Sequence, residues 1–275
     1  MNIKEEFYKK GIIKIDSILN NHQLEEFRKS IEKKFRETKK NYIQYDEWDD
    51  FPRLLNVIFK NKKFIRAIKN IYKNPIFYPD FIVQVDNYQK HIVPHQDLQS
   101  FYRYGDRREL KTIEYSKIGI YLQDSSEDDP TSIYAAECSH NFFLTKISRN
   151  LPFFGYKFLK LFRKILFRSQ KKLIKLCAGD VLVFDGQVMH SSVIKSKSKT
   201  LSPKINIYFS CVGGSESLYP VIKNEFLKFH QELNEKNKFK KTAHAHQRNY
   251  ILFNPFKNLN LDDFKLLKKD NFFIF

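Results

Sequence analysis

The spacing of apolar residues predicts two helices near the N-terminus. Over residues 21–38, apolar side chains recur every three or four positions with charged residues between them, which is the pattern of a helix with one buried face. The same spacing recurs over residues 60–73. We therefore expect residues 1–80 to form a mostly helical N-terminal part.

Short apolar runs between turn-forming residues predominate after this part. They are rich in β-branched and aromatic residues and predict strands over residues 81–85, 118–122, 173–176, 181–184 and 205–212. Many short strands separated by turns favour two sheets closed into a jelly roll. The predicted fold class is therefore mainly β with flanking helices, a cupin-like double-stranded β-helix.

The composition favours one domain over residues 1–275. The chain has 8 Gly and 9 Pro, and no low-complexity linker marks a boundary. Within this domain we expect a jelly-roll core over residues 81–214, with an insert at 145–172, and a C-terminal helical extension over 215–275. The three cysteines are too scattered for a disulfide framework or a zinc site.

Two short segments, far apart in the sequence, carry residues that bind metals. The first is His95-Gln96-Asp97, and the second ends the run Gly179-Asp180, four apolar residues, Asp185-Gly186 and then His190. Side chains at positions i and i+2 of an extended segment point to one face, so His95 and Asp97 could bind the same ion. With His190 they offer the two-His-one-carboxylate set of non-haem Fe(II) oxygenases.

Four stretches in this order resemble the phytanoyl-CoA dioxygenase family of Fe(II)/2-oxoglutarate-dependent oxygenases. They are the opening segment at residues 7–15 with the helical residues 24–29, the His95-Gln96-Asp97 motif, residues 117–124 followed by Ser139-His140, and residues 179–190. The resemblance covers roughly residues 5–212. It implies that His95, Asp97 and His190 ligate Fe(II), with 2-oxoglutarate and O2 at the three open positions.

The resemblance also implies residues for the far carboxylate of 2-oxoglutarate. Ser192 matches a family hydroxyl, but the family's arginine is missing, because no Arg lies between His190 and Gly214. Lys204 opens a predicted strand and is our first candidate in its place, although a lysine cannot form the paired hydrogen bonds of a guanidinium. Lys117 is a second candidate, and Gln84 could donate a further hydrogen bond.

Residues 150–172 form a basic amphipathic segment inside the predicted insert. Phe154, Phe158 and Leu161 fall on one face of a helical wheel, and Lys157 and Lys160 fall on another. Such a helix either packs on the jelly roll with a solvated lysine face or lies on an anionic membrane surface. A peripheral membrane contact through this segment is therefore one of two predictions.

The charge of the chain predicts an acidic small-molecule substrate. Lys plus Arg total 49 against 31 Asp plus Glu, a formal net charge of +18, which favours anionic partners such as lipids, glycolipids or sugar phosphates. Arg103, Arg107 and Arg108 follow the first metal segment and are candidates to bind such a group. The sequence argues against nucleic-acid binding, because it shows no groove-entering element or stacking platform.

The sequence leaves three classes of function open. The first is a 2-oxoglutarate-dependent hydroxylase in the cytoplasm, with or without membrane association, since the N-terminus shows no signal-peptide core. The second is a metal-binding jelly-roll enzyme that does not use 2-oxoglutarate, which the missing arginine keeps open. The third is a non-catalytic basic binding module, against which the complete set of ligands argues.

Overall fold

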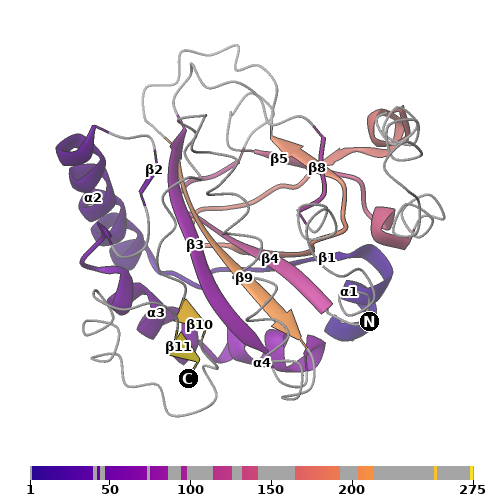
Figure 1. Cartoon of the computed structure of the whole chain (residues 1–275), viewed down its shortest axis with the longest axis horizontal. Coiled ribbons are helices and arrows are strands. Elements are labelled where there is room, and N and C mark those ends of the chain that lie inside the picture. The colour runs from indigo at the N-terminus through magenta and orange to yellow at the C-terminus, as the bar shows by residue number, and fades with distance from the viewer. Residues whose placement is uncertain are drawn as a thin grey trace.

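The computed structural model describes residues 2–39, 42–43, 47–72, 75–85, 94–97, 114–125, 132–141, 165–192, 204–213, 251–252 and 273–274. For residues 42, 76, 78–85, 192, 204, 251–252 and 273–274, it describes the backbone alone. The described elements form a jelly roll with helices on one side (Figure 1).

Two antiparallel sheets make up the jelly roll. The larger has the strand order β1-β7-β4-β9-β3-β2 and the smaller has the order β6-β5-β8. The strands of the larger sheet are β1 (Ile12–Ile15), β2 (Tyr42–Ile43), β3 (Ile76–Val85), β4 (Glu114–Tyr121), β7 (Val181–Asp185) and β9 (Lys204–Gly213). Those of the smaller are β5 (Ile133–Ala135), β6 (Lys172–Leu173) and β8 (His190–Ser192). A separate parallel pair joins β10 (Ile251–Leu252) to β11 (Phe273–Ile274).

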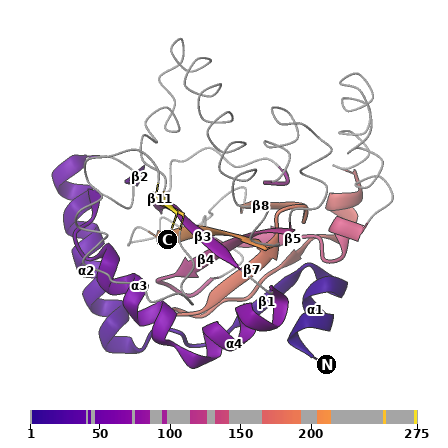
Figure 2. The same ribbon diagram turned by 60° about the horizontal axis from the view of Figure 1, so that its bottom comes forward.

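Four helices precede most of the sheet in the sequence. They are α1 (Ile3–Lys10), α2 (Asn21–Thr38), α3 (Phe51–Lys60) and α4 (Lys62–Ile71). In Figure 2, α2, α3 and α4 lie along one face of the large sheet, and β5 and β8 lie on its other side. Helix α2 has the predicted bounds, and its residues Leu24, Phe27, Ile31 and Phe35 are buried at the expected helical spacing.

The alternation of side chains along β4 divides the interior into two parts. Ile118 and Ile120 join the main hydrophobic core beneath the helices, whereas Tyr121 belongs to a second core on the opposite face. Strand β7 is buried on both faces in the same way, since Val183 joins the first core and Phe184 joins the second. The face that carries Tyr121 and Phe184 is the one turned toward the small sheet, and it positions the site described below.

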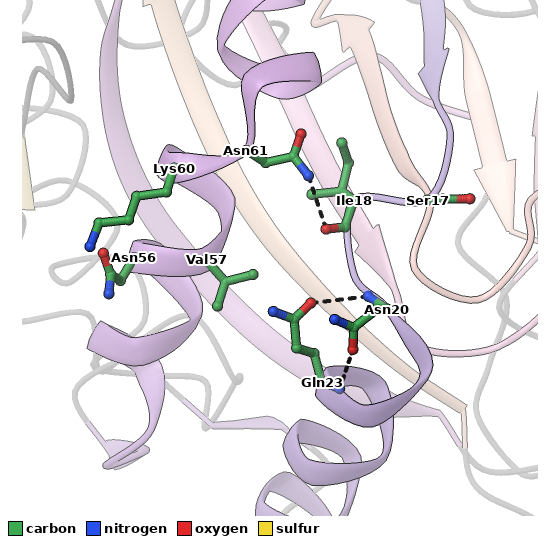
Figure 3. A pocket seen from close by; sticks show the side chains of 8 residues that line it. All are labelled: Ser17, Ile18, Asn20, Gln23, Asn56, Val57, Lys60 and Asn61. Carbon is green, nitrogen blue, oxygen red and sulfur yellow. Dashed lines mark hydrogen bonds between the residues drawn. The ribbon is translucent and has the colours of Figure 1, made fainter.

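The helix predicted over residues 60–73 is α4, which begins two residues later, after Asn61, and ends two residues earlier. The backbone N–H of Asn61 donates to the Ile58 carbonyl and ends α3, while its side-chain oxygen accepts from Lys63 N at 2.9 Å and starts α4. Its amide also donates to the Ile18 carbonyl at 3.2 Å, at the edge of a surface pocket (Figure 3). Two helices, α1 and α3, were not predicted as such, because both are short, with 8 and 10 residues.

The remaining strand predictions are met to different extents. The runs at 118–122, 181–184 and 205–212 correspond to β4, β7 and β9, and the run at 81–85 is the second half of the longer β3. The run at 173–176 is extended only at its start, since β6 ends at Leu173. Beyond it, Ile174 N donates to the Ile133 carbonyl, and the backbone of Leu176 bonds to Ser125.

Several predictions fall outside the described residues. These include the arginines 103, 107 and 108, residues 150–164 of the insert and the expected helix in the C-terminal extension. Residues 165–170 are helical, with Ile165 55% exposed and Phe167 buried. Among the described residues, no helix is both long enough and apolar enough to cross a membrane. The predicted domain boundaries stay a prediction.

Candidate metal site

The structure brings His95, Asp97 and His190 together between the two sheets. His95 and His190 form an antiparallel bridge, with His95 N donating to His190 O and His190 N donating to His95 O, both at 3.0 Å. Asp97 Oδ1 lies 3.3 Å from His95 Nε2 and 3.7 Å from His190 Nε2. The three ligand atoms all lie within 4.8 Å of one another.

The orientation of His190 is fixed by a backbone carbonyl. Its Nδ1 lies 3.0 Å from Val188 O, and because a carbonyl only accepts, Nδ1 carries the hydrogen. The lone pair is therefore on Nε2, the nitrogen that faces Asp97. The imidazole is buried, and its ring centroid lies 4.7 Å from that of Phe184, in an edge-on contact. Such a second hydrogen bond is what orients most metal-binding histidines.

Several hydrogen bonds stabilise the turn between β7 and β8. Met189 N donates to Ser139 Oγ at 2.8 Å, and the Gln96 side chain donates to the Gln187 carbonyl. Gln187 N in turn donates to Asp185 Oδ1 at 2.8 Å. Gln96, the middle residue of the first motif, is buried. Its hydrogen bond therefore links that motif to the turn that precedes His190.

Gly11 allows the N-terminal helix to pack against the same turn. It ends α1 with a φ of +74°, in the left-handed region that favours glycine. A Cβ at this position would lie 2.5 Å from Val188 Cγ2 and 2.5 Å from His140 Nδ1, so only glycine fits. His140 contacts α1 as well, with its Nε2 3.0 Å from the Tyr8 carbonyl. The Ser139-His140 turn of the sequence motif thus packs between α1 and the turn that precedes His190.

The electrostatics of the site favour the protonation states that a metal ion needs. Burial, together with the nearby His95, lowers the pKa of His190 to about 4, although Asp97 opposes the change. Burial would raise the pKa of Asp97, but His190, His95 and Lys117 outweigh it and hold that pKa below its usual value. At neutral pH, His190 is neutral and Asp97 is an anion, as metal ligands must be.

The geometry fits a bound transition-metal ion. Adjacent ligands at about 2.1 Å from an octahedral ion lie about 3 Å apart, close to the distances of Asp97 from the two histidines. Three protein ligands would leave three positions of an octahedral ion for other ligands. The nitrogen and oxygen donors suit Fe(II) among other divalent metals.

The predicted residues for 2-oxoglutarate fall into two groups. Lys117 lies on β4 and is close enough to Asp97 and His190 for its charge to influence their pKa values. Lys204, Ser192 and Gln84 are placed by backbone alone: Lys204 pairs with Val85, Gln84 with Ile205, and Ser192 with Ile133. Their side chains lie outside the described residues.

Two tyrosines beside Lys117 on the large sheet were not predicted from the sequence. Tyr121 follows Lys117 on the same face of β4, and Tyr208 lies on β9 opposite Gly119. The hydroxyl of Tyr208 accepts a hydrogen bond from Asn206 Nδ2 at 3.2 Å. An alternation of Lys117, Gly119 and Tyr121 was visible in the sequence, but only the strand register shows that Tyr208 joins them.

Comparison with known proteins supports the fold. No model of a protein family matches the chain, and no curated protein matches it. Among solved structures, HygX from Streptomyces hygroscopicus with nickel and 2-oxoglutarate bound is 14% identical, with a TM-score of 0.53 over 76% of this chain and 87% of that one. The non-heme alpha ketoglutarate dependent epimerase SnoN from nogalamycin biosynthesis is 12% identical, with a TM-score of 0.51 over 77% and 81%.

A third solved structure that is similar to this chain is also an alpha ketoglutarate dependent enzyme. The non-heme alpha ketoglutarate dependent carbocyclase SnoK is 13% identical, with a TM-score of 0.51 over 77% of this chain and 82% of that one. The chain therefore has the jelly-roll fold of these enzymes, as the strand pattern predicted, with a His-Asp-His cluster that could hold a metal. The narrower resemblance to the phytanoyl-CoA dioxygenase family stays a prediction.

Proposed function

We propose that the protein is an Fe(II)- and 2-oxoglutarate-dependent oxygenase that hydroxylates a C–H bond of a small anionic molecule. The convergence of His95, Asp97 and His190 carries the proposal, because it joins two distant segments in the ligand set of such enzymes. The fold supports it, since similar structures are alpha ketoglutarate dependent enzymes and one holds 2-oxoglutarate.

Each of the three residues has a separate task in this proposal. His190 presents Nε2 because Val188 holds Nδ1, His95 is fixed to His190 through the backbone bridge, and Asp97 supplies the negative charge. Bound Fe(II), 2-oxoglutarate and O2 together supply the oxidant, and the overall reaction gives the hydroxylated product, succinate and CO2. Phe184 and the burial of His190 shield one side of the site from water.

Hydroxylation is the finer part of the proposal. The similar structures include an epimerase and a carbocyclase, so this fold supports other outcomes. Asp97 favours hydroxylation over halogenation, because halogenating relatives replace the carboxylate ligand with a small residue to admit halide. Membership of the phytanoyl-CoA dioxygenase family is proposed on the sequence motifs, to which Gln96 and the Ser139-His140 turn add contacts with the β7–β8 turn.

The proposed substrate is acidic. The formal net charge of +18 supports it, together with Arg103, Arg107 and Arg108 after the first motif. A lipid, glycolipid or sugar-phosphate-like molecule has the required charge. Peripheral membrane contact through residues 150–172 is part of the same proposal, and the exposed Ile165 at the start of the described helix is consistent with it.

The proposal is tested by the release of labelled CO2 from 2-oxoglutarate labelled at its first carbon. Many such enzymes turn over slowly without substrate, so the test needs no substrate identity. We expect release that requires Fe(II) and is lost in Asp97→Ala. Asp16→Ala is the matched control, because Asp16 is exposed directly after β1 and its carboxylate pairs with Lys14 at the surface.

A second candidate function is a metal-dependent jelly-roll enzyme that does not use 2-oxoglutarate. The absence of an arginine between His190 and Gly214 favours it, because that residue normally binds the far carboxylate. If the protein binds Fe(II) but releases no CO2 from 2-oxoglutarate under any condition, this second candidate replaces the first.

A further inference from the structure

A surface pocket lies on the helical side of the large sheet, apart from the metal site. Its wall is formed by the segment that joins β1 to α2, by side chains of α2 and α3, and by Asn61 between α3 and α4 (Figure 3). Its volume is about 470 Å3, within the range of roughly 300–1,000 Å3 that ligand pockets commonly have. The candidate metal ligands lie between the two sheets, on the other side of the large sheet from these helices. A ligand in this pocket is therefore distinct from the substrate and cosubstrate of the metal site.

The first turn of α2 presents amide donors to this pocket. Asn20 Oδ1 accepts from Gln23 N at 2.9 Å, and Gln23 Oε1 accepts from Asn20 N at 3.0 Å (Figure 3). This reciprocal cap satisfies both side-chain oxygens. The two NH2 groups, Asn20 Nδ2 and Gln23 Nε2, are left as donors, and in the described part of the chain neither bonds to an acceptor.

Asn61 occupies two acceptors on another side of the pocket. Its Nδ2 donates to the Ile18 carbonyl at 3.2 Å, and its own Oδ1 accepts from Lys63 N at 2.9 Å and from Phe64 N at 3.3 Å. No carboxylate lines the pocket. The pocket therefore offers hydrogen-bond donors in excess of acceptors, which suits a ligand that accepts hydrogen bonds.

Lysines without ion pairs add positive charge at the pocket. Lys60, the last residue of α3, lines it beside Asn56, and Lys62 and Lys63 follow in the first turn of α4. In the part of the chain that the structure describes, none of these three lysines forms an ion pair. The carboxylate of Glu26, farther along α2, is paired with Arg53. The local charge is therefore positive and favours an anionic ligand.

The backbone beside the pocket is fixed by the turn that precedes β7. Ser17 N donates to Asp180 Oδ1 at 3.0 Å, and Ile18 N donates to the Gly179 carbonyl at 2.9 Å. Ser17 has a φ of +55°, in the left-handed region that a serine seldom adopts, and these bonds hold it there. Because this wall is already ordered, a ligand can bind without the cost of ordering the segment.

We propose that this pocket binds the phosphate group of a small phosphorylated molecule. A phosphate monoester carries a charge of about −1.5 to −2 at neutral pH and three strong acceptor oxygens, which matches the amide donors of Asn20 and Gln23 and the ammonium group of Lys60. Ile18 and Val57 add an apolar wall for the carbon skeleton that carries the phosphate. The proposal does not depend on the proposed function, since none of these residues is a candidate metal ligand.

The test is calorimetric titration of the full-length protein in a chloride buffer without phosphate or sulfate. The probes are ribose 5-phosphate, inorganic phosphate and ribose. We expect ribose 5-phosphate to bind more tightly than inorganic phosphate, because only the former also contacts the apolar wall, and we expect ribose not to bind. A wild-type protein that binds ribose and ribose 5-phosphate equally, or that does not bind ribose 5-phosphate, overturns the proposal.

Two substitutions remove a donor and keep the helix cap. Asn20→Asp and Gln23→Glu each replace an NH2 group with an acceptor oxygen, while aspartate remains a good N-cap and glutamate completes the same capping box. We expect each to weaken ribose 5-phosphate binding by about tenfold to hundredfold, as for loss of a hydrogen bond to a charged group. Lys60→Met should weaken it by about tenfold, without adding a negative charge.

Asn70→Asp is the matched control, because Asn70 is exposed on the last turn of α4 and does not line the pocket. It adds the same negative charge as Asn20→Asp, and its affinity for ribose 5-phosphate should stay within about twofold of the wild type. Wild-type affinity in Asn20→Asp, Gln23→Glu and Lys60→Met together would place the phosphate elsewhere and overturn the proposal. A loss in Asn70→Asp as large as in Asn20→Asp would also overturn it, since the protein would then respond to net charge and not to this pocket.

Discussion

At the scale of single residues, hydrogen-bond partners separate polar groups that stabilise the fold from buried polar groups that lower its stability. The Val188 carbonyl orients His190, and Ser139 holds the turn beside it, so these polar groups are already paired. Tyr121 differs, because its hydroxyl is buried and unpaired among the described residues. A buried hydroxyl in this state lowers the stability of the fold.

This difference predicts opposite effects of two conservative substitutions on stability. Tyr121→Phe removes an unpaired buried hydroxyl and should leave the free energy of unfolding of the metal-free protein unchanged or raise it by up to about 1 kcal/mol. Tyr115→Phe removes a paired hydroxyl and should lower it by about 1 kcal/mol. Urea unfolding measures both. A loss in Tyr121→Phe as large as in Tyr115→Phe would mean that Tyr121 has a structural partner.

The residues of the candidate metal site could be predicted from the sequence, whereas the meeting of Tyr121 and Tyr208 could not. His95, Asp97 and His190 stand in motifs whose residue types are specific for metals, and the structure brings all three together. Tyr121 and Tyr208 are ordinary strand residues by type. Their meeting depends on the register between β4 and β9 and on the space above Gly119, which only the paired strands define.

At the scale of elements, the sequence predicts well where local signals agree. Helix α2 has a capping box of Asn20 and Gln23 and a continuous apolar stripe, and its predicted bounds match. The prediction over residues 60–73 was wrong at its start, because the apolar spacing continues across Asn61 while the backbone does not. Asparagine caps a helix better than it continues one, and that signal was outweighed by the periodicity.

One contact between elements should be necessary for the metal site. The Gln96 side chain joins the first motif to the β7–β8 turn through the Gln187 carbonyl. Gln96→Leu keeps most of the side chain's volume but removes this bond, so we expect Fe(II) affinity to fall by about tenfold to hundredfold, as for other residues that orient metal ligands. Competition with a metal-sensitive dye measures the affinity.

The control for this prediction is Gln23→Leu, because Gln23 is a glutamine that caps α2 away from the metal ligands. It should lose some stability and keep its Fe(II) affinity. Unchanged metal binding in Gln96→Leu, with the fold intact by circular dichroism, would show that the backbone bridge between His95 and His190 is sufficient to assemble the site.

At the scale of the whole molecule, the jelly roll explains how distant segments form one site. The large sheet carries Lys117, Tyr121 and Tyr208 on the face turned toward the small sheet, and β8 of the small sheet begins at His190. The order of motifs in the sequence could predict this fold, because the spacing of strands and turns is typical of it. The substrate could not be predicted in the same way, since charge and composition describe the molecule as a whole and not one binding surface.

The central claim is that one chain holds both Fe(II) and 2-oxoglutarate at His95, Asp97 and His190. The most direct measurement is an anaerobic titration of the protein with Fe(II) and 2-oxoglutarate, followed by visible absorption. We predict a weak charge-transfer band in the wild type and in the control His22→Ala, whose histidine is 80% exposed on α2, and no band in His190→Ala. Iron binding in the wild type without this band, or a band that persists in His190→Ala, would contradict the account.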